Sequence, residues 1–292
     1  MRKLLLLAAA AAVAAPVLAQ PAQQTKQSQA QIKAPPAAPP LRLTAAHRAA
    51  IDEAIRRGRL LAAIDRAGQV TTRDMLGRIA DPAAAGIIGW VAEPEGNAVT
   101  VTYYARESDH FVAVYRSQML GGRAVSPVVY EAGSRPALTG NAARMAAARA
   151  AAGDLAHAPC GGDAFNTLVL PPASAEAPVL IYRISPRVAA DRVPAGGHYR
   201  TEVAADGTVG ETVALAADCR DLLSPAIAPG TTPRPLVVNA RELELPSELH
   251  VFLSLWTGRP LAVATGTEAL RGWGVTGQSI AQLPPETRQT GR

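Results

Sequence analysis

Cysteine and lysine are scarce in this chain of 292 residues. Cys160 and Cys219 are its two cysteines, and no lysine follows Lys33, so every later basic residue of the Lys/Arg type is arginine. Two cysteines are too few for a structural zinc site, and they lack the Cys-x-x-Cys spacing of redox motifs. An isolated pair in an oxidising compartment usually forms a disulfide, and we therefore expect a Cys160–Cys219 bond.

Long apolar runs are also lacking after the first twenty residues. Arg2 and Lys3 precede the apolar stretch LLLLAAAAAV, and small residues at Val17 and Ala19 are typical of a signal-peptide cleavage site. We expect residues 1–19 to be removed on export, an uncleaved membrane anchor being the alternative. The mature chain is then expected to be periplasmic or secreted and to have no transmembrane segment.

Neither sign of charge dominates the mature chain. Removing Arg2 and Lys3 leaves 27 of the 29 Lys and Arg residues against 24 acidic residues, a formal net charge of about +3. The sequence also shows no run of basic residues. Both observations argue against a nucleic-acid partner.

The composition divides the chain into three parts after the signal peptide. Residues 20–42 are mainly Gln, Ala and Pro, and they predict a disordered linker because they offer little apolar surface to bury. A folded domain is expected over residues 43–281, either as one unit or as two lobes, 43–137 and 138–281. The polar segment 282–292 is expected to be a frayed tail.

Two segments have the pattern of helices. The first is amphipathic: Thr44 is a suitable N-cap, apolar residues recur at helical spacing, and Gly68 is a suitable C-terminal residue. The second is rich in alanine and is expected to run from Thr139 or Asn141 to Gly153. Between and after these segments the apolar pattern alternates, which is typical of strands.

Turn signals divide the alternating regions into successive hairpins. The signals are Glu95-Gly96-Asn97, Leu120-Gly121-Gly122 and Asp206-Gly207. Together the patterns predict an α+β fold, mainly an antiparallel sheet built from hairpins, with an N-terminal amphipathic helix and a second, alanine-rich helix.

The segment 246–256, PSELHVFLSLW, admits two interpretations. Pro246 and Glu248 are residues that favour the start of a helix. The β-branched and aromatic content of HVFLSLW favours a strand. We predict a strand that turns across Thr257 to Pro260 into a further hairpin, with a helix as the alternative.

A central block of the sequence resembles a family of exported bacterial proteins without an assigned function. The residues that carry the resemblance are Cys160, FNTLVLPP, PVLIYRISP, GGHYRTEVAADG and Cys219, and the match extends roughly over residues 86–276. The resemblance implies a secreted or periplasmic α+β domain. It implies no chemistry, so it assigns no catalytic residue.

Common enzyme motifs are missing. The serines do not lie in a Gly-x-Ser-x-Gly turn, the glycines do not form a dinucleotide or phosphate-binding loop, and a disulfide would occupy both cysteines. No histidine has a second histidine two or four residues away, as simple metal sites on one strand or helix would have. We therefore expect no cofactor, and catalysis remains an alternative without an assigned catalytic residue.

One strand carries the best candidate for a binding site. In HYRTEV, alternation places His198, Arg200 and Glu202 on one face, where Arg200 and Glu202 can pair across two residues. This polar stripe is the predicted site. A weaker alternative is a metal site formed by His198, His250 and Glu202, should their two segments pack side by side.

Three functions follow from these observations. The first is an exported, non-catalytic module that binds an unknown ligand or an envelope protein. The second is a periplasmic hydrolase, one form of which would use a metal at His198 and His250. The third is an inhibitor or immunity-type protein. We expect the first.

Overall fold

The computed structural model describes residues 39–187 and 189–284. The predicted signal peptide, most of the predicted linker and the end of the predicted tail lie outside the described residues. The two ends of the described chain meet, because the backbone N–H and C=O of Leu41 form hydrogen bonds of 2.8 Å with the side-chain amide of Gln282. Gln282 is the last residue of a strand, so regular structure reaches at least this position.

Helix α1 is the longest element and spans Ala45–Leu76. The predicted N-cap is confirmed, because the Thr44 hydroxyl accepts a hydrogen bond from the His47 N–H and the Thr44 N–H donates to His47 Nδ1. The predicted end at Gly68 is wrong. Gly68 lies inside the helix against Trp90, and a Cβ at this position would lie 2.7 Å from Trp90 Cη2. Glycine here permits close packing and does not end the helix.

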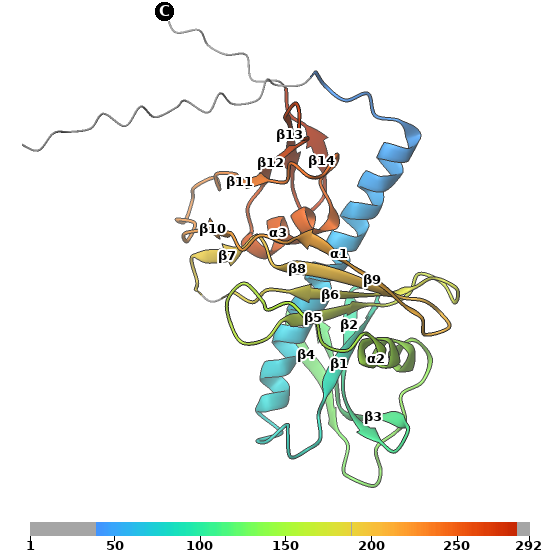
Figure 1. Ribbon diagram of the computed structural model, residues 1–292. Helices are drawn as coiled ribbons and strands as arrows, with labels where there is room; N and C mark the ends of the chain where they lie inside the picture. The colour runs from blue at the N-terminus through green and yellow to red at the C-terminus, as the bar shows by residue number, and fades with distance from the viewer. Residues whose placement is uncertain (1–38, 188, 285–292) are drawn as a thin grey trace, which may run out of the picture. The chain divides into compact units, whose positions relative to one another are not determined.

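An antiparallel meander follows α1, with the strand order β1-β2-β3-β4 (Figure 1). Its strands are β1 (Gly89–Glu95), β2 (Ala98–Glu107), β3 (His110–Leu120) and β4 (Arg123–Val129). The first two predicted hairpins are confirmed by the pairs Glu95↔Ala98 and Leu120↔Arg123. The Tyr103 hydroxyl joins this sheet to α1 through hydrogen bonds with the hydroxyls of Thr71 and Thr72, at 3.1 and 2.7 Å.

A second antiparallel sheet has the order β5-β6-β8-β9. Its strands are β5 (Asn166–Leu170), β6 (Val179–Ile184), β8 (His198–Val203) and β9 (Val209–Ala216), and the alanine-rich helix α2 (Gly140–Ala152) precedes them. The predicted helix and the hairpin at Asp206-Gly207 are confirmed. The Cys160–Cys219 disulfide is also present, with Cα atoms 5.3 Å apart, and it joins the segment before β5 to the segment after β9.

Helices cover both faces of the second sheet. Met145 of α2 shares a buried apolar cluster with Val179 and Val203 on one face. On the other face, Tyr182 and Ile184 belong to a larger cluster that also contains side chains of α1 and of the third helix. Strand β6 is consequently buried at every position.

A third sheet, with the order β11-β12-β13-β14, forms the C-terminal part of the fold. Its strands are β11 (Leu236–Asn239), β12 (Leu261–Thr265), β13 (Arg271–Val275) and β14 (Ile280–Gln282), and the short strands β7 (Arg192–Pro194) and β10 (Asp221–Leu223) pair with each other separately. β11 and β12 are parallel, whereas the other neighbours are antiparallel. A parallel pair needs a crossover, and a helix supplies it here.

That crossover is helix α3 (Glu248–Thr257), so the strand predicted over 246–256 and its hairpin are wrong. Ser247 is the N-cap, and its N–H donates to His250 Nδ1 at 3.0 Å. The helix packs against α1 so closely that a Cβ at Gly58 would lie 2.5 Å from Val251 Cβ. Because α3 is buried on most sides, most of its residues are apolar, and its strand propensity is overridden by packing. Within the described ranges, no helix is long and apolar enough to cross a bilayer.

Candidate functional site

The predicted polar stripe lies on β8 in the second sheet. His198, Arg200 and Glu202 alternate with Tyr199 and Thr201 as predicted, and Arg200 lies opposite Tyr182 of the neighbouring strand. Arg200 Nη2 is 3.3 Å from Glu202 Oε1, which confirms the predicted pairing of these two residues. Helices cover both faces of the sheet, so the stripe is largely enclosed instead of forming an open surface.

His198 joins neighbouring backbone segments by hydrogen bonds at the start of this strand. Its side chain is fully buried, Nδ1 accepts a hydrogen bond of 3.2 Å from the Ser185 N–H, and Nε2 donates to the Pro194 carbonyl at 3.0 Å. Burial lowers the pKa of His198 to about 4. Both ring nitrogens are therefore engaged by backbone groups, and the ring is neutral at neutral pH.

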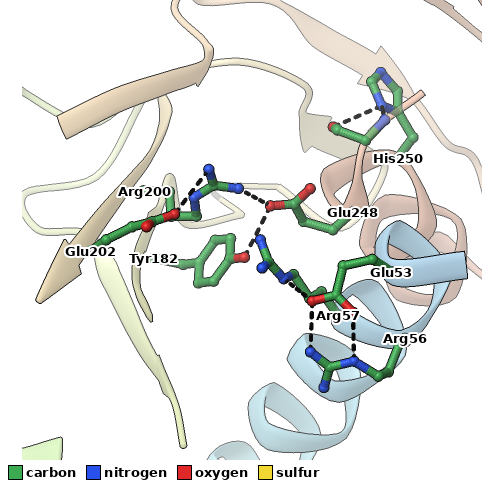
Figure 2. Close-up of polar contacts among 9 residues, drawn as sticks. Glu53, Arg56, Arg57, Tyr182, Arg200, Glu202, Glu248 and His250 are labelled. Carbon is green, nitrogen blue, oxygen red and sulfur yellow. Dashed lines mark hydrogen bonds and ion pairs between the residues drawn. The ribbon is translucent and has the colours of Figure 1, made fainter. Parts of the chain in front are cut away.

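Arg200 and Tyr182 meet a carboxylate that the sequence interpretation did not place in the site. Arg200 Nη1 donates to Glu248 Oε1 at 2.6 Å, and the Tyr182 hydroxyl donates to the same oxygen at 3.0 Å. Figure 2 shows these side chains converging between β6, β8 and the first turn of α3. This polar cluster, consisting of Tyr182, Arg200, Glu202 and Glu248, fastens α3 to the sheet.

Burial and charge explain the protonation states in the polar cluster. Burial, reinforced by the negative charge of Glu248, raises the pKa of the Tyr182 hydroxyl, which therefore stays a donor. Burial opposes the charge of Arg200, but Glu248, Tyr182 and Glu202 together outweigh burial, and the pKa of Arg200 is raised. One oxygen of Glu248 thus accepts hydrogen bonds from a neutral hydroxyl and from a cation.

The predicted metal ligands engage other partners. His250 Nδ1 accepts from the Ser247 N–H at the start of α3, His198 binds backbone groups through both nitrogens, and Glu202 pairs with Arg200. In the part of the chain that the structure describes, no group of three or more His, Cys, Asp or Glu side chains is placed to hold a metal. The structure does not support the metal site of His198, His250 and Glu202.

A cavity lies on the other side of the first turn of α3. Its volume is about 520 Å³, which falls in the range of small-molecule sites. The walls come from the end of β9, the segment that follows it, β10, β11 and the start of α3. The lining residues are Ala195, Ala214, Leu215, Ala216, Ala217, Asp218, Arg220, Asp221, Leu222, Val237, Val238, Asn239, Ala240, Glu242, Leu249 and His250.

The cavity lining combines apolar side chains with an excess of carboxylates. Asp218 pairs with Arg220 at 3.3 Å and Asp221 with Arg192 at 3.7 Å, whereas Glu242 has no ion pair within the described residues. Three lining carboxylates therefore accompany one lining guanidinium.

His250 adds a neutral donor to the cavity lining. Burial lowers the pKa of His250 to about 4, and Nδ1 is occupied by the Ser247 N–H, so the ring hydrogen resides on Nε2. In Figure 2 this ring points away from the polar cluster. A neutral N–H of this kind can donate to a ligand without adding charge.

The disulfide holds one wall of this cavity. Cys219 lies between Asp218 and Arg220, and the Arg220 carbonyl accepts a hydrogen bond of 2.7 Å from the Ala195 N–H. At the other end of the bond, the Cys160 N–H donates to Ser185 Oγ. A Cβ at Gly197 would overlap Cys160 Sγ, so glycine is required where this strand begins. The covalent bond thus fixes cavity-lining residues to the second sheet.

Sequence reasoning did not pair Glu248 with Arg200 and did not predict the cavity, for different reasons. The signal for Glu248 was present, since Pro246, Ser247 and Glu248 begin a helix well, but the strand interpretation was preferred. The cavity has no local signal because its walls come from β9, β10, β11 and α3, which follow one another in the sequence but belong to three different sheets and a helix. Searches against known protein families, curated proteins and solved structures found no match, so the resemblance to an exported family stays a prediction.

Proposed function

We propose that this chain is an exported, non-catalytic binding module whose ligand occupies the cavity between β9, β10, β11 and α3. The observation that carries the proposal is the cavity itself, about 520 Å³ in volume with apolar walls and a few polar groups. Sites for small organic molecules have this size and this mixture of surfaces.

The lining favours a ligand with a cationic nitrogen and an apolar part. Asp218, Asp221 and Glu242 supply negative charge. Arg220 pairs with Asp218 and Arg192 pairs with Asp221, so Glu242 is the lining carboxylate without an ion pair among the described residues. The exposed rim supports an apolar contact, since Val237 lines the cavity and is 73 % exposed. A compact organic amine would match both features.

Export is supported by the disulfide, because such bonds persist in oxidising compartments. A non-catalytic role is supported by the two buried histidines. His198 and His250 both have a pKa near 4 and both engage backbone groups, which suits a structural role better than general-base catalysis at neutral pH.

A thermal-shift screen tests the proposal. The purified protein is heated with organic amines and with neutral analogues of the same shape. A ligand at one hundred times its dissociation constant stabilises by about 2.7 kcal/mol, which raises the Tm of a domain of this size by about 5–10 °C. We expect amines, and not their neutral analogues, to give such shifts. Equal shifts with both series, or none with either, would contradict a cation-binding cavity.

A further inference from the structure

Helix α1 carries four exposed arginines in a line. Arg48, Arg59, Arg66 and Arg73 are all exposed, and they are separated by 11, 7 and 7 residues. An α-helix turns by about 100° per residue, so residues 7 or 11 positions apart point in directions that differ by only about 20° around the helix axis. The four side chains therefore form a nearly straight arginine stripe about 37 Å long.

Over the second half of α1 the arginine stripe points away from the protein core. Ile64 and Met75 are buried, and they lie about 160° and 180° around the helix axis from Arg48. In the second half of α1, which Figure 1 shows as the long blue helix, the core and the stripe thus occupy opposite sides. In the first half, Ile55 lies within about 20° of Arg48 around the axis and packs against the core cluster.

Carboxylates of α1 leave most of this positive charge uncompensated. Glu53 binds Arg56 and Arg57, Asp74 binds Arg78, and Asp65 is buried against Gln69 and Asn166. Asp52 is the remaining carboxylate of the helix. Within the described part of the chain, Arg59 and Arg66 form no ion pair, and the guanidinium groups of Arg48 and Arg73 bind only backbone carbonyls.

The turn between β3 and β4 adds an apolar and a cationic group beside the stripe. A Cβ at Gly122 would lie 3.3 Å from Arg66 Nη2, so this turn adjoins the middle of the stripe. Leu120 at the turn is 40 % exposed, and Arg123 is exposed. A lipid headgroup region accepts cations and an exposed leucine together, whereas a soluble polyanion would use the cations alone.

We propose that the arginine stripe of α1 docks the protein on an anionic lipid surface. All four arginines lie along one side of a single helix, so they can reach one plane at the same time. Charge complementarity then supplies the attraction, and Leu120 adds a shallow apolar contact. The stripe shares no residue with the cavity, so the proposal stands independently of the proposed ligand.

Flotation with lipid vesicles tests this docking surface. The full purified chain is mixed with vesicles of phosphatidylglycerol and phosphatidylethanolamine, or of phosphatidylcholine alone, at 50 mM and 300 mM salt. We expect binding to the anionic vesicles at low salt and release at high salt, because screening shortens the reach of the charges. Arginine does not titrate near neutrality, so binding should be the same at pH 6 and pH 8.

Charge-matched variants distinguish the effect of the arginine stripe on vesicle binding from the effect of net charge. The double variant R59Q/R66Q should bind anionic vesicles about 30-fold more weakly, a loss equivalent to about 1 kcal/mol for each arginine. The control R116Q/R234Q removes the same charge from exposed positions outside α1 and should bind like the parent. Circular dichroism and thermal melting of both variants confirm that they are folded.

Three outcomes overturn the proposal: equal binding to neutral vesicles, no binding to any vesicle, or equal weakening by both double variants. A further test adds a soluble sulfated polysaccharide. If the chain binds that polymer through the stripe but does not bind vesicles, the occupant is a soluble polyanion and the lipid proposal is wrong.

Discussion

The first turn of α3 separates two groups of polar side chains that have opposite surroundings. On the sheet side, Glu248 is enclosed with Tyr182 and Arg200, and each of the three is bound to another. On the cavity side, Glu242 and His250 line a space of about 520 Å³. Polar groups that bind one another stabilise a fold, whereas polar groups around a space are available to a ligand.

Substitutions on the two sides of α3 should therefore change different measured properties. Substitutions on the sheet side should lower the free energy of unfolding, because they leave buried groups without partners. Substitutions of cavity carboxylates should change ligand affinity with little effect on stability.

Acid should produce the largest loss of stability. His198 and His250 have pKa values of about 4 in the folded protein, below the ordinary value of 6.5, so the unfolded chain binds protons first as the pH falls. The free energy of unfolding therefore decreases from pH 6.5 towards pH 4, by about 3 kcal/mol for each ring. Urea unfolding at a series of pH values measures this slope.

Histidine variants test whether His198 and His250 cause the pH dependence of the free energy of unfolding. H198Q and H250Q should each remove about half of the pH dependence between pH 6.5 and pH 4, whereas H110Q, at an exposed position, should leave it unchanged. A slope that persists in a double H198Q/H250Q variant would show that other groups cause the acid sensitivity.

Loss of the disulfide should have the next largest effect. The bond closes a loop of about 60 residues, and its removal costs about 4 kcal/mol in the chain-entropy model. The double variant C160S/C219S, compared with the oxidised parent by urea unfolding, measures this cost. A melting curve of the parent that is insensitive to reductant, or free thiols in the purified protein, would reject the bond.

Removing Glu248 should cost about 3 kcal/mol, because E248A leaves the buried Tyr182 hydroxyl and the guanidinium of Arg200 without their common partner. The matched control is E202A. The Glu202 side chain is 43 % exposed, so losing its ion pair should cost less than about 1 kcal/mol. Equal costs for the two variants would contradict the structural role of the polar cluster.

Crowding at the α1–α3 contact should cost somewhat less. G58A places a Cβ 2.5 Å from Val251 Cβ, and overpacking of this kind costs about 2 kcal/mol. On an exposed helix the same change would stabilise the protein by about 1 kcal/mol. The sign of the change in stability therefore shows whether α1 and α3 are in close contact at Gly58. A stabilised G58A protein in thermal melting would show that the two helices do not pack this closely.

The sequence predicted local features well. The hairpins at Gly96 and Asp206-Gly207 and the N-cap at Thr44 depend on a few neighbouring residues, so their patterns are visible in the sequence. The disulfide followed from having two cysteines. These features required no knowledge of how distant segments pack.

The errors arose where distant packing decides the structure. Gly68 resembles a helix end until Trp90 packs against it, and HVFLSLW resembles a strand until burial of α3 explains its apolar side chains. The cavity could not be predicted, because its walls are brought together by three sheets and a helix. The four arginines of the stripe are 7 and 11 residues apart, so they form no cluster in the sequence and align only on a continuous helix.

The most direct test of the account is a calorimetric titration of an organic amine selected by the thermal-shift screen. The variant D221N/E242Q removes two carboxylates from the cavity lining, and E131Q/E211Q removes the same charge from exposed positions outside it. We predict that the cavity variant binds at least about tenfold more weakly than the parent while its free energy of unfolding changes by less than about 1 kcal/mol. Unchanged affinity in the cavity variant, or an equal loss in the control, would contradict the claim that this cavity is the binding site.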